Sequence, residues 1–485
     1  MEKQCSKSGD LKLVNKKKSK SKNLNIQILI GTLASVLVNG ITFISAPIFS
    51  RMLGVDDYGI VTVYEAWIKI ISIVCGIQTC ASIGTARVHF PEKDFNNYVT
   101  SALTLSMCSS VGFIALAAIF GKLLENIFGL DYILIIILFI NSAASYFVNF
   151  QSMVFIQQKK VLSNGLLSLG LISSTICLSM IFIHVFPTNH YLGRVFGLLF
   201  PNIILSIYII IHTLRSSKQW YNRIFWKYAL MLGGPIVFHN LSTVILAQTD
   251  KIMLQKSAEA YTAVGLYGLV VSFVHVLSIL YTSINNVWVP FYYDDMKNGN
   301  FTAILCKTGN YLKMGTVLFA GFIFLAPEVF RLYSSEEYWT MIPLIPIIAA
   351  SSYLMLLYTF AVNYEFYMKQ TKLIAMGSCI AALCNFILNS FLIPLFGITG
   401  AAVATCISYV LLFIFHQFMA VTISKKNKEY PYHLKWAYIV KPFLLMLVII
   451  VISYCLQNYM FIRWGLAGCI GVCWVMDLYR RKSIF

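Results

Sequence analysis

The residues of this sequence that could do chemistry are charged side chains inside long apolar segments. Glu65 and Lys69 stand four residues apart in one such segment, and Glu365 and Lys369 repeat that spacing in a later one. Asp250 and Lys251 close a third apolar run. Charged groups are costly in an apolar environment, so in membrane proteins they mark the paths of ions or substrates. These residues therefore predict the binding and movement of a charged ligand.

The composition shows what surrounds these charged residues. Hydrophobic residues make up 58% of the 485 residues and charged residues only 12%, whereas about a quarter of a soluble domain is charged. A bilayer offers no partner for free backbone groups, so each crossing needs a helix of about 20 apolar residues. The sequence therefore predicts an all-α polytopic membrane protein with about 14 transmembrane helices. The approximate spans are 26–50, 58–83, 98–120, 132–156, 162–186, 191–213, 228–249, 262–287, 308–330, 340–364, 372–394, 398–421, 437–457 and 460–477.

Basic residues are distributed unequally between the two sides of these predicted spans. The sequence holds 37 Lys and Arg against 19 Asp and Glu, which gives a formal net charge of +18. When alternate loops are assigned to opposite sides, 29 of the 37 basic residues fall on the side of the N-terminus. This asymmetry follows the positive-inside rule, so both termini are expected in the cytoplasm. The basic N-terminal tail is interpreted as a topology signal or a contact with anionic lipids, and nucleic-acid binding is not expected.

The second predicted span carries Glu65 and Lys69 on one polar face. Ser72, Gly76 and Thr79 continue this face, because the five residues are spaced four, three, four and three apart. Such a face is expected to look into protein or water rather than lipid. Two interpretations stay open: the face lines a transport lumen, or Glu65 and Lys69 neutralise each other where two helices pack.

Polar residues also form stripes in the two spans that flank Asp250 and Lys251. Pro235 follows two glycines in the first of these spans, so a kink or break is expected there. Lining of a cavity and hydrogen bonding between helices both explain such stripes. The stripe residues are His239, Thr243 and Asp250 in the first span, and Ser272, His275, Ser278, Thr282 and Asn286 in the second.

Short motifs recur along the chain and indicate an internal repeat. Val148-Asn149-Phe150 recurs as Val362-Asn363-Tyr364, and each is followed by a polar run in which Gln157 corresponds to Lys369. Six predicted spans separate the members of each pair, so corresponding helices run in the same direction, as in a parallel repeat of two six-helix lobes. Two extra C-terminal helices follow the lobes. The predicted parts are a basic cytoplasmic tail 1–25, an N-lobe 26–214, a basic cytoplasmic linker 215–227, a C-lobe 228–423, and helices 13 and 14 with a basic cytoplasmic end, 424–485.

Motifs for catalysis or metal binding are missing from the sequence. The twelve cysteines form no Cys-x-x-Cys pair, and histidines and cysteines do not cluster at metal-ligand spacing. No nucleophile triad, phosphate loop or zinc signature occurs, so an enzyme, a metal site and a cofactor are not expected. If the protein is a transporter, an ion, H⁺ or Na⁺, is expected to be coupled to transport. Glu65 or Asp250 is the expected binding group for this ion.

Several of these motifs resemble those of a known family. Arg51 is followed by Leu53-Gly54 and then Tyr58-Gly59, which is similar to the first-hairpin signature of the polysaccharide-export flippases. These flippases belong to the superfamily that also holds multidrug-extrusion proteins and lipid II flippases. Asp250-Lys251, Trp288-Val289-Pro290 and the small residues from Gly397 to Ala402 resemble recurrent motifs of the same family, and the resemblance covers about 26–425. Arg87, which precedes Pro91 in a cytoplasmic loop, also matches the family; it is interpreted either as a phosphate ligand or as a topology anchor.

The resemblance implies a flippase of the bacterial cytoplasmic (inner) membrane. It would move undecaprenyl-diphosphate-linked oligosaccharide repeat units for a surface polysaccharide such as O-antigen or capsule, by alternating access of the two lobes. Its partners would be that lipid-linked oligosaccharide, membrane lipids, a polysaccharide polymerase and a chain-length regulator. The predicted substrate-binding residues of the cavity are Arg51, Glu65, Lys69, Arg87, His239, Asp250, Lys251, His275, Asn286, Glu365 and Lys369.

Two alternatives to the flippase remain. A multidrug or cation antiporter of the same superfamily would need acidic groups to dominate the cavity, whereas Glu65 and Glu365 each have a lysine four residues later. A membrane polymerase or glycosyltransferase is the less favoured alternative. Such enzymes usually keep a sizeable extracytoplasmic loop, whereas the outward loops between the predicted spans of this sequence are short. The sequence identifies neither the sugar nor the oligomeric state.

Overall fold

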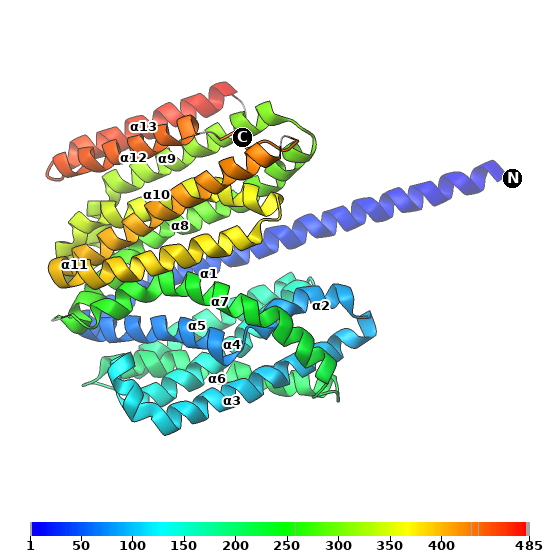
Figure 1. Ribbon diagram of the computed structural model, residues 1–485, viewed down its shortest axis with the longest axis horizontal. Helices are drawn as coiled ribbons and strands as arrows, with labels where there is room; N and C mark the ends of the chain where they lie inside the picture. The colour runs from blue at the N-terminus through cyan, green and yellow to red at the C-terminus, as the bar shows by residue number, and fades with distance from the viewer. Residues whose placement is uncertain (1, 258, 428, 435, 482–485) are drawn as a thin grey trace. The chain divides into compact units, whose positions relative to one another are not determined.

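The structure is a computed structural model that describes residues 2–257, 259–427, 429–434 and 436–481. Over these residues the chain is built of long α-helices joined by short turns, with three 3₁₀ segments and no strand (Figure 1). The all-α fold predicted from the sequence is therefore confirmed. The α-helices are α1 Glu2–Cys75, α2 Ile83–His89, α3 Phe95–Phe128, α4 Tyr132–Gln157, α5 Val161–Val185, α6 His190–Ser216, α7 Arg223–Leu254, α8 Ala260–Lys297, α9 Phe301–Tyr333, α10 Ile345–Tyr367, α11 Thr371–Lys426, α12 Trp436–Cys455 and α13 Met460–Arg481, and the 3₁₀ segments are η1 Thr79–Ser82, η2 Glu92–Asp94 and η3 Glu336–Leu344.

Among the described residues, 12 helical segments are long and apolar enough to cross a membrane. Two of them are interrupted, because Gly54 in α1 (φ 73°, ψ 177°) and Gly397 in α11 (φ 55°, ψ −130°) have backbone angles outside the helical region. Glycine reaches such angles without a steric penalty, since it has no Cβ. Both interruptions lie between two spans predicted from the sequence. If each side of both breaks crosses the membrane, the number becomes the expected 14, which stays a prediction.

The described chain packs as two compact units. Unit 1 contains the described residues up to Ser45 together with Ile71–Val237, and unit 2 contains Ala46–Ile70 together with the described residues from Phe238 onward. This division follows packing, whereas the predicted lobes follow the repeat, and the two differ in where they place Ala46–Ile70. The lobe and linker boundaries therefore stay a prediction.

Unit 1 contains a break in the second predicted span. After α1 ends at Cys75, Ile77 and Gln78 take left-handed backbone angles (φ 47° and 48°), which are rare for residues other than glycine. Hydroxyl groups on α3 satisfy the carbonyl groups that the break exposes: Oγ of Ser110 donates to the Cys75 carbonyl at 3.2 Å. A Cβ on Gly233 of α7 would lie 2.8 Å from the Ile77 carbonyl oxygen, so a glycine is needed where α7 crosses the break.

Two glycines allow the first segment of unit 2, Ala46–Ile70, to pack closely against α8. Ala46–Ile70 packs along α8, where a Cβ on Gly59 would lie 1.9 Å from the Tyr261 carbonyl oxygen and a Cβ on Gly265 would lie 2.1 Å from that of Val55. A side chain at either glycine would push the two helices apart, and small residues are the common means of close helix approach in membranes. This contact brings Glu65 and Lys69 to the same unit as Asp250 and Lys251.

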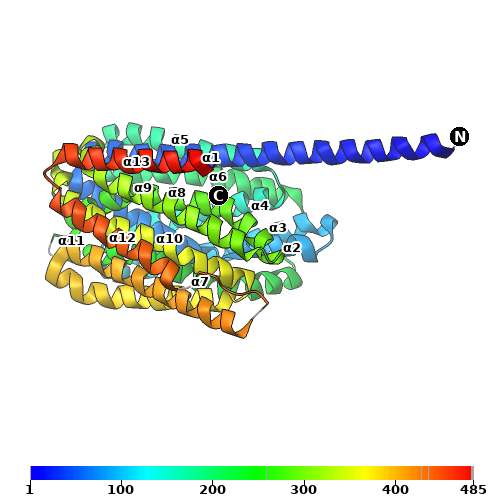
Figure 2. The ribbon, with the colours of Figure 1, turned by 90° about the horizontal axis from the view of Figure 1, so that it is seen from above.

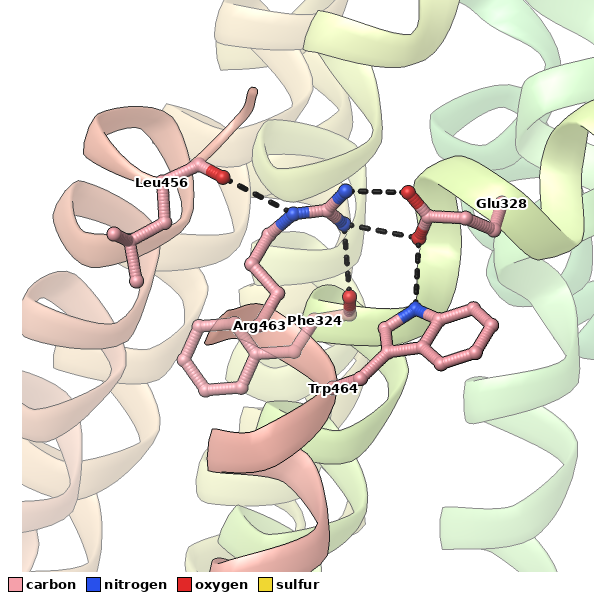
Figure 3. A network of polar contacts seen from close by, with 5 residues as sticks. All are labelled: Phe324, Glu328, Leu456, Arg463 and Trp464. Atoms are coloured by element: carbon pink, nitrogen blue, oxygen red, sulfur yellow. Dashed lines mark hydrogen bonds and ion pairs between the residues drawn. The ribbon is translucent and has the colours of Figure 1, made fainter. Parts of the chain in front are cut away.

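The last two helices dock on α9. α12 and α13 lie beside α9 in Figure 1 and Figure 2, in agreement with the packing of both helices against it. Arg463 of α13 is 2% exposed and makes a bidentate contact with the Glu328 carboxylate of α9. The same guanidinium donates to the carbonyl groups of Phe324 and Leu456, and the Trp464 indole donates to Glu328 (Figure 3).

A turn of the same conformation follows α4 and α10. Lys159 (φ 59°) and Lys369 (φ 57°) both take the left-handed conformation two residues after the helix ends. In each turn the next residue's N–H donates back five positions, from Lys160 to Phe155 at 2.9 Å and from Gln370 to Glu365 at 2.8 Å. The sequence aligned Gln157 with Lys369, and this was wrong by two residues, because the helix ends pair Lys159 with Lys369. The geometry nevertheless supports the internal repeat.

Replacing Lys369 by glycine is expected to raise the free energy of unfolding by roughly 0.5–1 kcal/mol. Glycine removes the steric cost of the left-handed backbone conformation. Part of this gain is lost, because glycine also increases the conformational entropy of the unfolded chain. Lys369→Ala removes the same charge and keeps the penalty, so it serves as the matched control. If the lysine charge contributes to transport, both variants lose transport equally. If the residue matters only for the turn, Lys369→Gly keeps full transport. Thermal unfolding and a transport assay on both variants decide between these roles.

Candidate functional site

The most elaborate polar cluster in unit 2 surrounds a buried carboxylate. Asp250 of α7 is 5% exposed and accepts hydrogen bonds from four neutral side chains. The Tyr267 hydroxyl on α8 and the Asn389 amide on α11 each lie 2.7 Å from its oxygens, the Thr405 hydroxyl at 2.5 Å and the Asn385 amide at 3.3 Å. Buried carboxylates are tolerated when hydrogen bonds replace their lost hydration. We refer to these five residues as the Asp250 cluster.

Two further oxygen atoms near this point of the fold are buried and have no hydrogen-bond donor in the structure. They are Oδ1 of Asn389 within the Asp250 cluster and Oε1 of Gln248, two residues before Asp250. Such orphaned oxygens carry an energetic cost of about 1–3 kcal/mol each unless something binds them. The Asp250 carboxylate and Oδ1 of Asn389 therefore offer oxygen ligands to a hard cation, and the carboxylate can also take up a proton.

A second group of charged side chains lies next to the Asp250 cluster. Partly buried Lys251 lies within electrostatic range of Lys69, Glu65 and Asp250. Exposed His275 on α8 lies within range of Lys69 and Lys251. We refer to Glu65, Lys69, Lys251 and His275 as the lysine group. Glu65 and the adjoining Asp250 match the charge of its two lysines, and the lysines offer cationic hydrogen-bond donors to an anionic ligand.

Ten of the eleven predicted site residues, all except Arg87, lie in unit 2, and five of them come together at the Asp250 cluster and the lysine group. Glu65 and Lys69 come from α1, Asp250 and Lys251 from α7, and His275 from α8. His239 also lies on α7 in this unit, and its Nδ1 atom is buried without a hydrogen-bond partner. The role of these residues in substrate binding stays a prediction.

The predicted arginines make contacts with backbone groups. Exposed Arg51, in unit 2, donates to the Leu332 carbonyl at 2.7 Å. Exposed Arg87, in unit 1, donates to the Gln157 carbonyl and lies 5.7 Å from the centre of the Phe95 ring. Their predicted roles toward phosphate stay predictions.

The remaining predicted residues do not form the pairs that the sequence suggested. Glu365 does not contact Lys369; its carboxylate is fully buried against His416, 2.9 Å from Nδ1. Lys369 lies beyond the end of α10 at Tyr367, so the four-residue spacing does not place the two side chains on one helix face. Exposed Asn286 on α8 makes no hydrogen bond that the structure assigns, whereas neighbouring Asn285 accepts one from Asn363 at 2.8 Å.

Sequence reasoning missed several residues of the site. Asn385 and Asn389 stand four residues apart in an apolar span, which is the same signal that singled out Glu65 and Lys69. Thr405 and His416 lie in the following span without a comparable pattern. Their roles depend on which helices pack around Asp250 and Glu365.

The sequence matches one known family over most of its first two thirds. Residues 26–294, more than half of the chain, match the family described as "Polysaccharide biosynthesis protein". The chain belongs to this polysaccharide biosynthesis protein family. The flippase-type family inferred from the hairpin motifs is thereby confirmed.

Curated relatives of this polysaccharide biosynthesis protein come from Haemophilus influenzae. One, described as an uncharacterized membrane protein, is 22% identical over 363 residues, which cover 73% of this chain and 86% of the relative. Another, a protein of the Lsg locus, is 24% identical over 368 residues, which cover 73% of this chain and 87% of the relative. The chain is thus a multi-pass membrane protein with relatives of similar extent.

Solved structures share the fold of this family member. The lipid II flippase MurJ in an inward closed conformation superposes with a TM-score of 0.71 at 16% identity, over 94% of this chain and 99% of that one. An inward-facing multidrug resistance MATE transporter superposes with a TM-score of 0.60 at 13% identity, over 83% and 99%. At this identity the likeness shows the fold, which is that of the superfamily containing both transporters.

If this polysaccharide biosynthesis protein exports a polysaccharide, Lys69→Ala is expected to lower that export several-fold while the protein still folds and inserts. The substitution removes one cation from the lysine group and leaves Glu65 with less compensation. Export can be measured as surface polysaccharide per folded protein. If the double variant Glu65→Gln/Lys69→Ala restores export, the two residues serve helix packing and not the ligand.

Proposed function

We propose that this protein is a flippase that moves undecaprenyl-diphosphate-linked oligosaccharide repeat units from the cytoplasmic to the outer leaflet. The observation that carries the proposal is the lysine group, in which Lys69, Lys251 and His275 gather beside Glu65 and the adjoining Asp250 in a member of the polysaccharide biosynthesis protein family. A diphosphate carries negative charge and accepts hydrogen bonds, so it needs cationic donors such as Lys69 and Lys251. The undecaprenyl chain can stay in the bilayer while the headgroup crosses.

The Asp250 cluster is the proposed coupling site. A buried carboxylate surrounded by neutral donors, with the partnerless Oδ1 of Asn389 in the same cluster, can exchange its hydrogen bonds for a proton or a Na⁺ ion. Binding would change the net charge beside the lysine group, because Lys251 adjoins Asp250. If this charge is more favourable in the inward-open or in the outward-open conformation, the ion binds one of them more tightly. Alternating access requires such a difference in affinity.

The proposed location is the bacterial cytoplasmic (inner) membrane with both termini in the cytoplasm, as the distribution of basic residues indicates. A flippase in that position delivers its product to the outer face, where a polymerase and a chain-length regulator would use it. These two proteins are the proposed partners, together with membrane lipids.

The experiment is the sidedness of lipid-linked repeat units in spheroplasts of a strain that lacks the gene. We expect complete repeat units to accumulate at the inner face, protected from an impermeant lectin or glycosidase, and the surface polysaccharide to be absent. A polymerase defect would instead expose single units outside. Loss of a multidrug antiporter, the fold's other known class, would leave the polysaccharide intact. Full accessibility of the units from outside would refute the flippase.

A further inference from the structure

A buried acid and a buried imidazole face each other in unit 2, apart from the Asp250 cluster. The Glu365 carboxylate is 0% exposed and the His416 ring 1% exposed. Nδ1 of His416 lies 2.9 Å from one carboxylate oxygen and 3.1 Å from the other. In a buried site an uncompensated charge is costly, so this pair is most stable when its two members hold one proton between them. Gain or loss of a proton leaves a net charge there.

Aromatic side chains pack against the Glu365–His416 pair. On α10, the Tyr358 ring stacks on the His416 imidazole with centroids 5.7 Å apart. On α11, Gly377 provides space, since a Cβ there would lie 2.7 Å from Nε2 of His416. Tyr432 precedes α12 and lies near Glu365; burial and then the neighbouring Tyr292 of α8, Glu365 and Tyr364 raise the pKa of its phenol well above 10. The titratable groups that these contacts place against the pair are tyrosines.

The sequence neighbours of the pair hold the 429–434 segment, which leads into α12. Gln417, directly after His416, donates to the Leu434 carbonyl at 2.6 Å and accepts from the Tyr432 hydroxyl at 2.9 Å. Tyr364, directly before Glu365, donates to the Tyr430 carbonyl at 2.8 Å. The backbone N–H of Tyr432 donates to Ser424 at 2.8 Å. A shift of Glu365 or His416 would therefore move the groups that fasten the segment.

A row of rings leads from this pair toward the Asp250 cluster. Tyr358 stacks on His416 on one side and on Tyr409 on the other, with centroids 6.4 Å apart in the second contact. Tyr409 in turn lies within electrostatic range of Asp250. The pair thus contacts the ring row through Tyr358, while its sequence neighbours Gln417 and Tyr364 bind the 429–434 segment.

We propose that Glu365 and His416 form a proton-binding site distinct from the Asp250 cluster, and that a change in its proton count loosens the 429–434 segment. The proton comes from water that reaches the pair as the segment opens, and it returns by the same route. The net charge left in the site is then hydrated instead of buried. This inference does not depend on which substrate the protein carries.

The test is hydrogen–deuterium exchange of the purified full-length protein in lipid nanodiscs, without a transport assay. Exchange of the 429–434 amides is measured between about pH 5 and pH 8 and corrected for the intrinsic pH dependence of exchange. In the wild type we expect the corrected rate to change about tenfold across this range, within the range of typical coupling energies. Glu365→Gln and His416→Gln are each expected to abolish the change. The double variant Glu365→Gln/His416→Gln retains a neutral hydrogen bond and serves if a single variant does not fold.

His433→Gln is the matched control, since His433 lies within the same segment and packs on Phe301 at 4.4 Å. This variant is expected to keep the pH response of the wild type. The proposal is overturned by a wild-type response that survives in the pair variants, by a response that disappears in His433→Gln, or by no response in the wild type. None of these outcomes bears on whether the protein is a flippase.

Discussion

Replacing Asp250 by asparagine is expected to reduce transport at least about tenfold, in the range of typical coupling energies, while the protein still folds. Asparagine has the same size and keeps one oxygen for the Asn385 and Asn389 amides. The hydroxyl groups of Tyr267 and Thr405 can rotate to accept from the new amide, so the expected loss of stability is only about 1 kcal/mol. The substitution does remove the negative charge, and with it the proposed binding of a proton or Na⁺.

Two measurements on Asp250→Asn check this prediction. Transport is followed by the sidedness of lipid-linked repeat units, and cation binding by the thermal unfolding of the purified protein in Na⁺ and in K⁺ at several pH values. Asp295→Asn is the matched control, because Asp295 also lies in unit 2 but pairs with Lys307 at 2.6 Å. The coupling role is excluded if Asp250→Asn keeps both transport and the cation and pH responses of the wild type.

The largest effect on stability is expected at Arg463. Arg463→Leu should destabilise the docking of α12 and α13 by about 3–5 kcal/mol, because it leaves the Glu328 carboxylate without its charged partner. The substitution also removes the donor to the carbonyl groups of Phe324 and Leu456. Arg463→Lys should recover only part of this loss, since lysine cannot make the bidentate contact with Glu328.

Limited proteolysis and thermal unfolding of the detergent-solubilised protein measure this effect. Cleavage is expected first in the turn between α11 and α12. The double variant Glu328→Leu/Arg463→Leu should be close to wild type, because it leaves no buried charge behind. Arg331→Leu is the control on the same helix, where the exposed guanidinium lies 5.6 Å from the centre of the Trp339 ring. Equal loss of stability in Arg463→Leu and the double variant would show that the charge compensation is unimportant.

The arrangement of helices along the chain could be predicted from the sequence. Apolar runs of sufficient length must be helical in a bilayer, since only local hydrogen bonds satisfy the backbone there. The breaks at Gly54 and Gly397 were also expected at positions between apolar runs, because glycine permits the angles they need. Charged residues inside these runs pointed to Asp250, Lys251 and the polar face of the second span.

Which charged residues meet was not predictable in the same way. Spacing along one helix shows only which side chains share a face, and it suggested that Glu365 pairs with Lys369. The helix end at Tyr367 removes Lys369 from that face, and His416, 51 residues away, becomes the partner. The partners of Asp250 on α11 are likewise 135–155 residues distant.

The sequence by itself determined that the protein lies in a lipid bilayer, that it is helical and to which family it belongs. Each of these depends on local composition or on short motifs. The tertiary structure alone decided that Gly59 and Gly265 bring Glu65 and Lys69 to the unit of Asp250, and that Tyr267, Asn389 and Thr405 surround its carboxylate. The physical reason is that a charge in an apolar interior is compensated by whichever helices can approach closely enough. That approach depends on the shapes of two surfaces far apart in the chain.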